Sequence, residues 1–435
     1  MNVIVIVNDS YRPDHLGCYG NDWIKTPNVD AFAKESMVFE NAYAEGLPTV
    51  PVRTAWFTGR YTFPFRGWQR LEPTDILLGE ILWDKGYNSA YITDAYHLHK
   101  PTMAFERGFD YVKFVRGHEG DPHILDKSIP IDTAKYHKDN ENDPAGSKKT
   151  LDMLEQYLRN RHDWKDDSDT FVAKVVKEGV KWLEEQEKRD NLFLWLDCFD
   201  PHEPWDPMPP FDTMYTDPKY NGQPIIFPVP GYTKDYLTDE ELENTFKLYA
   251  GKCSQCDKWV GVFLDKVREL GMMDDTLIVF VSDHGEPFGE HGFVRKAFPF
   301  PYIEETQIPL IIRHPEGVGA GKRSNGFTMT PDLFSTILDF LSIRQPRKTH
   351  GKSLLPVMRG DEEELWEFAL SCRFQAAWRI HTHEHVFIRY LVKDKPNELY
   401  DITNDPQEQK NLIEDQKDLA EELNAKLQTF AEGLR

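Results

Sequence analysis

Apolar runs rich in β-branched residues recur along the chain and predict the strands of a central sheet. They lie at residues 3–7, 90–92, 192–196, 277–281 and 309–312. They do not alternate with polar residues, which is typical of strands buried on both faces, as in a parallel sheet. Between the runs, apolar residues recur every three or four positions and predict helices, notably over 172–183 and 260–270. Strands and helices alternate, so we predict an α/β fold with a large, mostly parallel sheet flanked by helices.

The pattern changes past residue 351. Short strand-like pieces at 368–374, 377–382 and 385–392 precede an amphipathic helix, whose apolar stripe is Leu419, Leu423, Leu427 and Phe430. We therefore predict a catalytic domain over 1–350 and a C-terminal subdomain over 351–435, built from a small antiparallel sheet and a helix. Residues 117–169 are rich in Asp, Lys, His, Asn and Pro, and we expect a solvated surface insertion there, with a helix near 151–158.

Composition and charge narrow the range of functions. The 435 residues include 51 Lys and Arg against 73 Asp and Glu, which gives a formal net charge of −22, and 40% of the chain is hydrophobic. The chain is too apolar to be disordered and too acidic to bind a nucleic acid polymer. Because an acidic protein repels anions at long range, an anionic substrate would need a local cluster of cationic side chains.

The N-terminus and the cysteines indicate a cytoplasmic protein. The apolar run at 3–7 has no basic residues before it and no small-residue cleavage site, and no stretch approaches the ~18 apolar residues of a membrane span. We expect no membrane association. Five thinly spread cysteines do not suggest a disulfide framework. Cys253 and Cys256 lack a second ligand pair for zinc and fall on one helical stripe, so we interpret them as core residues.

Polar residues follow four of the predicted strands at the point where each ends. They are Asp9, then Asp94 and His97, then Asp200 and His202, then Asp283 and His284. Because ligands of open α/β sheets bind beyond the carboxyl ends of the strands, these residues are expected to meet at one edge. Asp9, Asp283 and His284 suit a divalent ion such as Mn²⁺, Zn²⁺ or Ca²⁺. The alternative is an ordinary helix cap followed by a buried histidine.

A short helix is predicted from Thr49 to Gly59, with Pro51 early and the glycine at its end. Thr49 would begin this helix, where free N–H groups and the helix dipole favour an anion. Arg53 lies one turn further on the same face and can reach the same anion. The alternative for Thr49 is a simple capping role.

Taken together, the chain resembles the sulfatase branch of the alkaline phosphatase superfamily along nearly its whole length. The motifs that carry this resemblance are NVIVIVNDSYRPDHLGCYG, KTPNVDAFAKES, FENAYAE, FTGRYT, SDHGEPFGEHG, PLIIRHP and ELYDITNDPQEQKNL, in this order. The resemblance implies a large α/β domain with a mixed sheet, a smaller C-terminal antiparallel subdomain, and hydrolysis of sulfate, phosphate or phosphonate esters at a metal.

The resemblance also implies roles for individual residues. Asp9, Asp283 and His284 match metal ligands, and Thr49 occupies the position of the nucleophile, which also contacts the metal. The cationic cluster that the net charge requires would consist of Arg53, His97, His202 and Lys296, which match the family's arginine, its two histidines and its lysine. We expect these four side chains to bind the anionic ester and to assist catalysis, with His97 or His202 as the general acid.

Three departures from the family pattern bear on the chemistry. Ser10 stands where the family has its second aspartate, and His284 stands where it often has an asparagine. We therefore expect one ion, and Mn²⁺ or Zn²⁺ in preference to Ca²⁺. Ala95 stands where the family has a lysine, and this replacement removes one contact to the anion. The nucleophile of sulfatases is a formylglycine made from Cys or Ser, and Thr49 cannot form that aldehyde because its β-carbon carries a methyl group.

We therefore predict a hydrolase that cleaves a phosphodiester or phosphonate monoester, a small anionic ester, through an unmodified Thr49. One alternative is a sulfatase that tolerates threonine, and another is a pseudoenzyme that only binds an anion. A homo-oligomer is compatible with the sequence. The aromatic and basic segments at 63–70 and 298–302 either line the leaving-group pocket or pack in the core.

Overall fold

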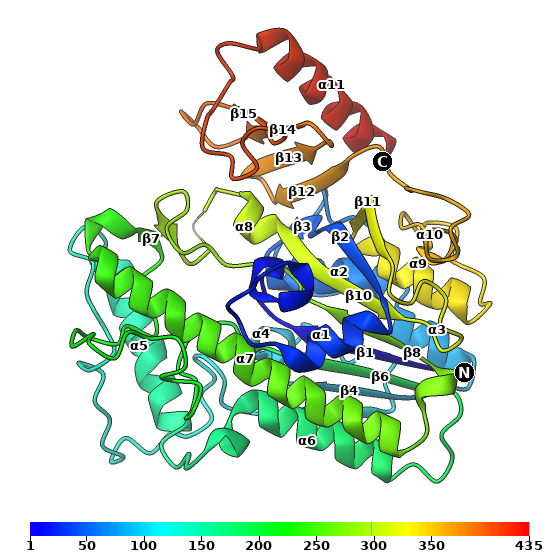
Figure 1. Cartoon of the computed structure of the whole chain (residues 1–435), viewed down its shortest axis with the longest axis horizontal. Helices are drawn as coiled ribbons and strands as arrows, with labels where there is room; N and C mark the ends of the chain where they lie inside the picture. The colour runs from blue at the N-terminus through cyan, green and yellow to red at the C-terminus, as the bar shows by residue number, and fades with distance from the viewer. Residues whose placement is uncertain (297, 435) are drawn as a thin grey trace.

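The computed structural model describes residues 1–296 and 298–434 and contains an eight-stranded central sheet (Figure 1). The strand order is β11-β2-β10-β8-β1-β6-β4-β5. Its centre confirms four of the predicted strands, which run parallel to one another: β8 (Thr276–Val281), β1 (Asn2–Asn8), β6 (Leu192–Cys198) and β4 (Asn88–Thr93). The carboxyl ends of these strands therefore lie along one edge of the sheet.

One predicted strand has the other direction. β10 (Gln307–Arg313) pairs antiparallel with β8. The chain between them contains no long crossover helix, so it returns along the neighbouring strand instead of crossing the sheet. The apolar run could not reveal this, since a strand buried on both faces has the same composition in either direction. Three strands lacked a recognisable apolar run: β2 (Met37–Tyr43), β5 (Tyr111–Phe114) and β11 (Arg323–Met329).

The two faces of the sheet are covered by different helices, and β1 separates the two cores. Ile4 and Ile6 pack in one hydrophobic cluster with residues of α6 (Phe171–Glu184) and α7 (Asp239–Glu269). Val3, Val5 and Val7 point to the other cluster, with residues of α2, α3 and α9, whose bounds are Thr49–Thr58, Leu78–Asp84 and Pro331–Phe340. This alternation is the two-residue period of a strand buried on both faces. Cys253 and Cys256 are buried in the first cluster, as predicted.

The C-terminal strands form a second sheet above the first (Figure 1). Its order is β15-β14-β13-β12-β3, and α11 (Lys417–Gly433) packs against β13 and β14. The C-terminal strands pair antiparallel and have the bounds Ala369–Arg373, Ala377–His381, His385–Tyr390 and Glu398–Asp401, for β12 to β15. β3 (Gly46–Leu47) belongs to the N-terminal part of the chain and pairs parallel with β12. The smaller sheet is thus joined to the segment that leads directly into α2.

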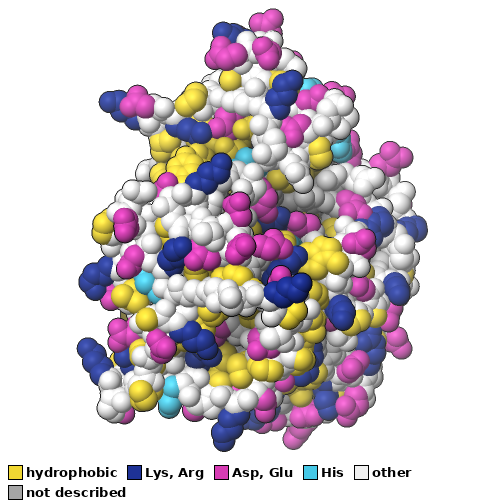
Figure 2. Space-filling view, turned by 60° about the vertical axis from the view of Figure 1, so that its left-hand side comes forward, with side chains coloured by type: hydrophobic (Ala, Val, Ile, Leu, Met, Phe, Trp, Pro, Cys, Tyr) yellow, Lys and Arg dark blue, Asp and Glu magenta, His cyan; other side chains and the backbone are white. Residues whose placement is uncertain are grey.

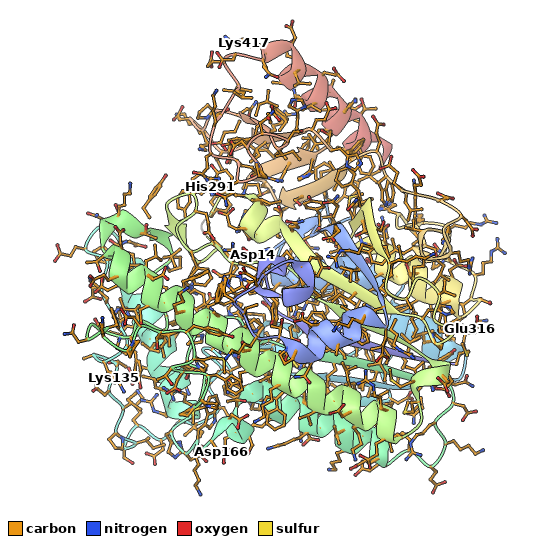
Figure 3. All side chains as sticks on the ribbon, in the orientation of Figure 1. Asp14, Lys135, Asp166, His291, Glu316 and Lys417 are labelled. Carbon is orange, nitrogen blue, oxygen red and sulfur yellow. The ribbon has the colours of Figure 1, made fainter. Side chains whose placement is uncertain are left out.

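A loop after β8 also reaches the segment between β15 and α11. His291, labelled in Figure 3, has its Nδ1 atom 2.8 Å from Glu304 Oε1 and its Nε2 atom 3.0 Å from the carbonyl oxygen of Glu408. The other α-helices and strands are α1 (Pro27–Lys34), α4 (Tyr96–His99), α5 (Pro144–Asn160), α8 (Ile303–Thr306), α10 (Leu355–Arg359), β7 (Gly231–Tyr232) and β9 (Phe293–Val294). Among the described residues, no helix combines the length and the apolar character that crossing a membrane requires.

Residues 117–169 carry the predicted helix as α5, but the expectation of a solvated insertion is wrong for part of the segment. His118 and Asp121 are fully buried, and Glu119 is nearly so. Leu154 and Tyr157 of α5 pack in the same hydrophobic cluster as α6 and α7. The polar composition was misleading, because these polar groups are buried together with partners from other parts of the chain.

Candidate active site

Asp9, Asp283 and His284 meet at the carboxyl ends of β1 and β8, as predicted. Their ligand-type atoms all lie within 4.8 Å of one another, and all three side chains are fully buried. His284 Nε2 is 3.4 Å from Asp283 Oδ2 and 3.7 Å from Asp9 Oδ1. Two carboxylates and an imidazole, converging out of contact with water, form a donor set of the kind that holds a divalent ion.

The hydrogen bonding of His284 fits this role. Its Nδ1 atom lies 2.8 Å from the carbonyl oxygen of Gly285, which can only accept a hydrogen bond. The proton is therefore assigned to Nδ1, and the lone pair of Nε2 faces the two carboxylates. A carbonyl that fixes the tautomer in this way is characteristic of histidines that bind metals.

The two carboxylates carry opposite pKa shifts. Burial, together with repulsion from Asp283, raises the pKa of Asp9 well above its ordinary value. Burial also opposes ionisation of Asp283, yet Arg53 and His284 lower the pKa of that carboxyl to about 2. Ser10 follows Asp9 and has a φ of 61°, a strained conformation for a residue with a side chain. In this conformation its N–H donates a hydrogen bond to Asp283 Oδ1 at 3.0 Å. The strained residue therefore helps to hold the carboxylate of Asp283 in place.

Thr49 is the first residue of α2 and faces the same group. The helix has the predicted extent: it ends at Thr58, and Gly59 follows in the left-handed conformation with a φ of 64°. Thr49 Oγ1 lies 3.3 Å from His284 Nε2, and the side chain is buried. Because Nε2 carries a lone pair, the threonine hydroxyl is the donor of this contact.

Arg53 lies one turn beyond Thr49 and is fully buried among carboxylates. Its Nη1 atom is 3.0 Å from Asp9 Oδ2 and also contacts Asp283, while Nη2 is 2.7 Å from Asp197 Oδ1. Sequence reasoning identified the arginine but missed Asp197. A signal was available, since Asp197 is a charged residue within the apolar run of β6, where an unpaired charge would be costly.

Lys296 is likewise held by acidic residues that the sequence analysis missed. Its ammonium lies 2.7 Å from Glu203 Oε2 and also pairs with Glu286, and both carboxylates are fully buried. Burial would lower the pKa of Lys296, but the two carboxylates raise it above its ordinary value. Burial and Glu203 raise the pKa of Glu286 to about 8. The expected cationic cluster is therefore largely neutralised by buried acids.

The two candidate general acids have different surroundings. His97 Nε2 lies 2.8 Å from Glu119 Oε2. Burial would raise the pKa of Glu119, but the contact with His97 outweighs this effect and the pKa is lowered. His202 stacks on Phe199 with ring centroids 4.0 Å apart, and its Nδ1 atom lies 2.8 Å from the carbonyl oxygen of Glu203. Burial lowers the pKa of His202 well below its ordinary value. His202 is therefore neutral near pH 7.

A second group of potential metal ligands lies at the ends of β4 and β6. Asp94, His118 and Asp200 are buried with their ligand-type atoms within 4.8 Å of one another. Lys252, however, lies 2.7 Å from Asp200 Oδ1 and brings a positive charge to this group. The aspartates after the four strands therefore belong to two separate groups, where a single one was expected, and His97 and His202 belong to neither.

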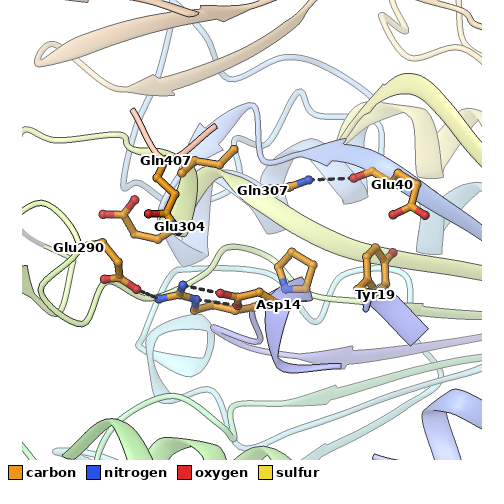
Figure 4. Close-up of a pocket in the computed structure, with 10 residues that line it drawn as sticks. Asp14, Tyr19, Glu40, Glu290, Glu304, Gln307 and Gln407 are labelled. Atoms are coloured by element: carbon orange, nitrogen blue, oxygen red, sulfur yellow. Dashed lines mark hydrogen bonds and ion pairs between the residues drawn. The ribbon is translucent and has the colours of Figure 1, made fainter. Parts of the chain in front are cut away.

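The surface offers cavities of different character. Figure 2 shows basic and acidic side chains interspersed over one face, with acidic ones prominent across its middle. The cavity in Figure 4, of about 230 Å³, is lined by Asp14, Glu40, Glu290 and Glu304, and its Arg12 is paired with Asp14 and Glu290. This excess of carboxylates disfavours an anionic ester. Another cavity, of about 610 Å³, is lined by His97 and Glu119 and carries several cations.

Comparison with known proteins agrees with this geometry. The family model described as Sulfatase matches residues 1–343, and one described as N-sulphoglucosamine sulphohydrolase, C-terminal, matches residues 289–433. N-acetylglucosamine-6-O-sulfatase of Bacteroides thetaiotaomicron is 24% identical, with 95% of this chain and 82% of the relative covered. An arylsulfatase of Clostridium perfringens is 26% identical, with 95% and 90% covered.

The same fold occurs among solved structures. The phosphonate monoester hydrolase of Agrobacterium radiobacter superposes with a TM-score of 0.77 at 22% identity, over 100% of this chain and 96% of that one. The enzyme of the same name from Silicibacter pomeroyi gives a TM-score of 0.75 at 21% identity, over 99% and 94%. The chain therefore belongs to the sulfatase family of the alkaline phosphatase superfamily and is a hydrolase of ester bonds.

Proposed function

We propose that the protein hydrolyses a phosphodiester or a phosphonate monoester, with the unmodified Thr49 hydroxyl as nucleophile. The observation that carries this proposal is the contact of Thr49 Oγ1 with His284 Nε2, at 3.3 Å, beside two buried carboxylates. Threonine cannot become formylglycine, the group that allows sulfatases to release sulfate by breaking a C–O bond of the nucleophile. A phosphorylated threonine, in contrast, can be released by attack of water on phosphorus.

Asp9, Asp283 and His284 are the residues that would hold a divalent ion, Mn²⁺ or Zn²⁺ by their donor atoms. Such an ion lowers the pKa of a hydroxyl beside it and neutralises charge on a phosphoryl oxygen. Arg53 orients the two aspartates, since its Nη1 atom touches both. Lys296 lies among Glu203 and Glu286 and keeps a positive charge near the reacting group.

His97 is our candidate for the general acid. It lines the larger cavity, where a leaving group fits, and its contact with Glu119 orients the ring. A neutral imidazole is a poor acid and the Nδ1 proton of His202 faces the carbonyl oxygen of Glu203, so we assign His202 to binding the ester oxygens. The proton of His97 would pass to the leaving oxygen as the P–O bond breaks.

Sulfate ester hydrolysis is the second candidate function, and the names of the relatives favour it. The two relatives compared above are both named as sulfatases. The two functions differ in the step that frees the enzyme, because a sulfothreonine has no equivalent of the formylglycine release. A pseudoenzyme that only binds an anion would share the site but show no turnover.

A substrate panel with intact-mass analysis tests the proposal. Purified protein with Mn²⁺ or Zn²⁺ would be assayed on aryl phosphodiesters, phosphonate monoesters, phosphate monoesters and sulfate esters with the same leaving group. We expect the diester or phosphonate to react fastest and the mass to equal that of the encoded chain. A preference for sulfate esters with unmodified Thr49 would contradict the proposal, and absence of any turnover would favour the pseudoenzyme.

A further inference from the structure

The larger cavity opens beside the candidate general acid and is linked by ion pairs to Lys296. Its volume is about 610 Å³, and His97, Glu119 and Arg295 form part of its wall. Arg295 Nε lies 2.6 Å from Glu203 Oε1, and the other oxygen of that carboxylate pairs with Lys296. Another part of the wall comes from α5, with the exposed Lys149, the buried Thr150, and Gly146 and Met153, which are half-buried. The inserted segment therefore shapes the space next to the reacting group.

Two lysines in this cavity have no carboxylate partner among the residues that the structure describes. Lys100 Nζ lies 4.9 Å from the centre of the Tyr96 ring, and Lys149 lies on the exposed side of α5. The two acidic residues of the cavity are already engaged: Glu119 pairs with His97, and Asp143 caps α5 by accepting from Gly146 N at 2.9 Å. In a chain with a net charge of −22, two free ammonium groups beside the site indicate a negatively charged ligand.

The cavity also has an exposed aromatic side chain. Trp68 is 48% exposed, and its ring meets that of His97 edge to face with centroids 5.0 Å apart. It belongs to segment 63–70, for which the sequence left pocket lining and core packing open. Both occur: Phe63 packs in the core and Trp68 lines the cavity. An indole exposed next to a candidate general acid offers a flat apolar surface for a ring.

We propose that this cavity binds the leaving group, and that the leaving group is a ring that carries a second anionic group. The ring would lie against Trp68, and the second anion would contact Lys100 and Lys149. This inference rests on the proposed function only in placing the ester next to Thr49, and it applies to whichever ester is cleaved. The shared chemistry is that of an aromatic acid or of a sugar acid.

A pair of esters that differ only in the charge of the leaving group tests the proposal. The substrates are phenylphosphonate monoesters of 3-hydroxybenzoate and of 3-hydroxybenzamide, together with the matching sulfate esters. We expect Lys149→Met and Lys100→Met each to lower the carboxylate-to-amide ratio of kcat/KM by about twofold to fivefold, as for one exposed ion pair. Comparing ratios between variants cancels the different intrinsic reactivity of the two phenols.

Further variants separate charge from general effects. Lys188→Met removes an exposed lysine outside the cavity and should leave the ratio unchanged. Lys149→Glu should lower the ratio further than Lys149→Met, and Trp68→Ala should raise KM for both esters. An unchanged ratio in all three Lys100 and Lys149 variants would overturn the proposal, whichever ester class the enzyme prefers.

Product binding gives a readout that does not depend on turnover. Titration calorimetry would compare 3-hydroxybenzoate with 3-hydroxybenzamide, and glucuronate with glucose. Tighter binding of either acid than of its neutral partner, lost in Lys149→Glu, supports the proposal and shows whether the ring is aromatic or a sugar. Equal binding of acid and neutral compound in both pairs contradicts it. Absence of phosphoryl turnover would contradict the proposed function without affecting this comparison.

Discussion

His284 and Thr49 are 235 positions apart in the sequence, yet Nε2 of the histidine faces Oγ1 of the threonine at 3.3 Å. The contact joins the end of β8 to the start of α2. Because the carbonyl of Gly285 fixes the proton on Nδ1, the free lone pair of His284 points toward the carboxylates and the hydroxyl. The candidate nucleophile therefore lies at the edge of the candidate metal site.

Substitution of Thr49 tests the nucleophile. Thr49→Ala should lower kcat/KM about a thousandfold or more, because the attacking oxygen is lost, while Thr49→Ser should keep substantial activity. Steady-state kinetics on the best substrate of the panel would measure both. Since α2 retains its other contacts, thermal unfolding of Thr49→Ala should match that of the wild type. An active Thr49→Ala variant would exclude the threonine as nucleophile.

Metal binding should require His284. We expect one divalent ion per chain, and His284→Ala should weaken its affinity by about a hundredfold or more, since even residues that only orient a ligand have effects of up to that size. Elemental analysis after equilibrium dialysis against Mn²⁺ or Zn²⁺ gives the stoichiometry. His123→Ala, an exposed histidine, is the control. Two ions per chain would contradict this prediction and direct attention to the cluster of Asp94, His118 and Asp200.

Lys296→Ala should lower turnover and also destabilise the fold. The loss of stability follows because Glu203 and Glu286 would lose a common partner while fully buried. We expect a loss of about 3 kcal/mol in the free energy of unfolding, measured by urea denaturation. Lys296→Ala combined with Glu286→Gln should recover part of this stability but not the turnover.

The contribution of His97 to kcat/KM should depend on the leaving group. His97→Gln should lower kcat/KM by about a hundredfold or more for esters of weakly acidic alcohols and much less for activated phenols, which need no proton. Glu119→Gln should have the same trend with a smaller effect, because the ring keeps its position but loses its ionic partner. A plot of rate against leaving-group pKa measures the trend. The same trend in His202→Gln, with none in His97→Gln, would reverse the assignment.

Glu45 should make stability depend on pH. Burial raises its pKa to about 7, although Thr62 and Phe63 donate hydrogen bonds to the carboxylate. The folded protein thus holds this proton more tightly than the unfolded chain does. Its contribution to stability is full below pH 4.5 and is lost as the pH rises toward 7, by about 3 kcal/mol at most. Urea denaturation from pH 4.5 to 8 should show a smaller decline for Glu45→Gln than for the wild type.

Local sequence patterns determined the elements that carry the site. The apolar runs of β1 and β8 end two positions before Asp9 and Asp283, so strand burial alone located two of the candidate ligands. Gly59 and the proline-rich start fixed the extent of α2, because these residues act on their own backbone within a few positions. The resemblance to sulfatases then indicated the order of the motifs and the position of the candidate nucleophile.

Only the tertiary structure decided which charges meet. Arg53 and Asp197 are 144 positions apart, and Lys296 and Glu203 are 93 apart, so no local pattern links either pair. The direction of β10 and the burial of His118 likewise depend on the path of the chain between elements. The energy of a buried charge is set by its neighbours in space, and the packing of distant segments determines those neighbours. The sequence by itself therefore determined the candidate residues, and the fold determined which of their charges are balanced and which face the cavity.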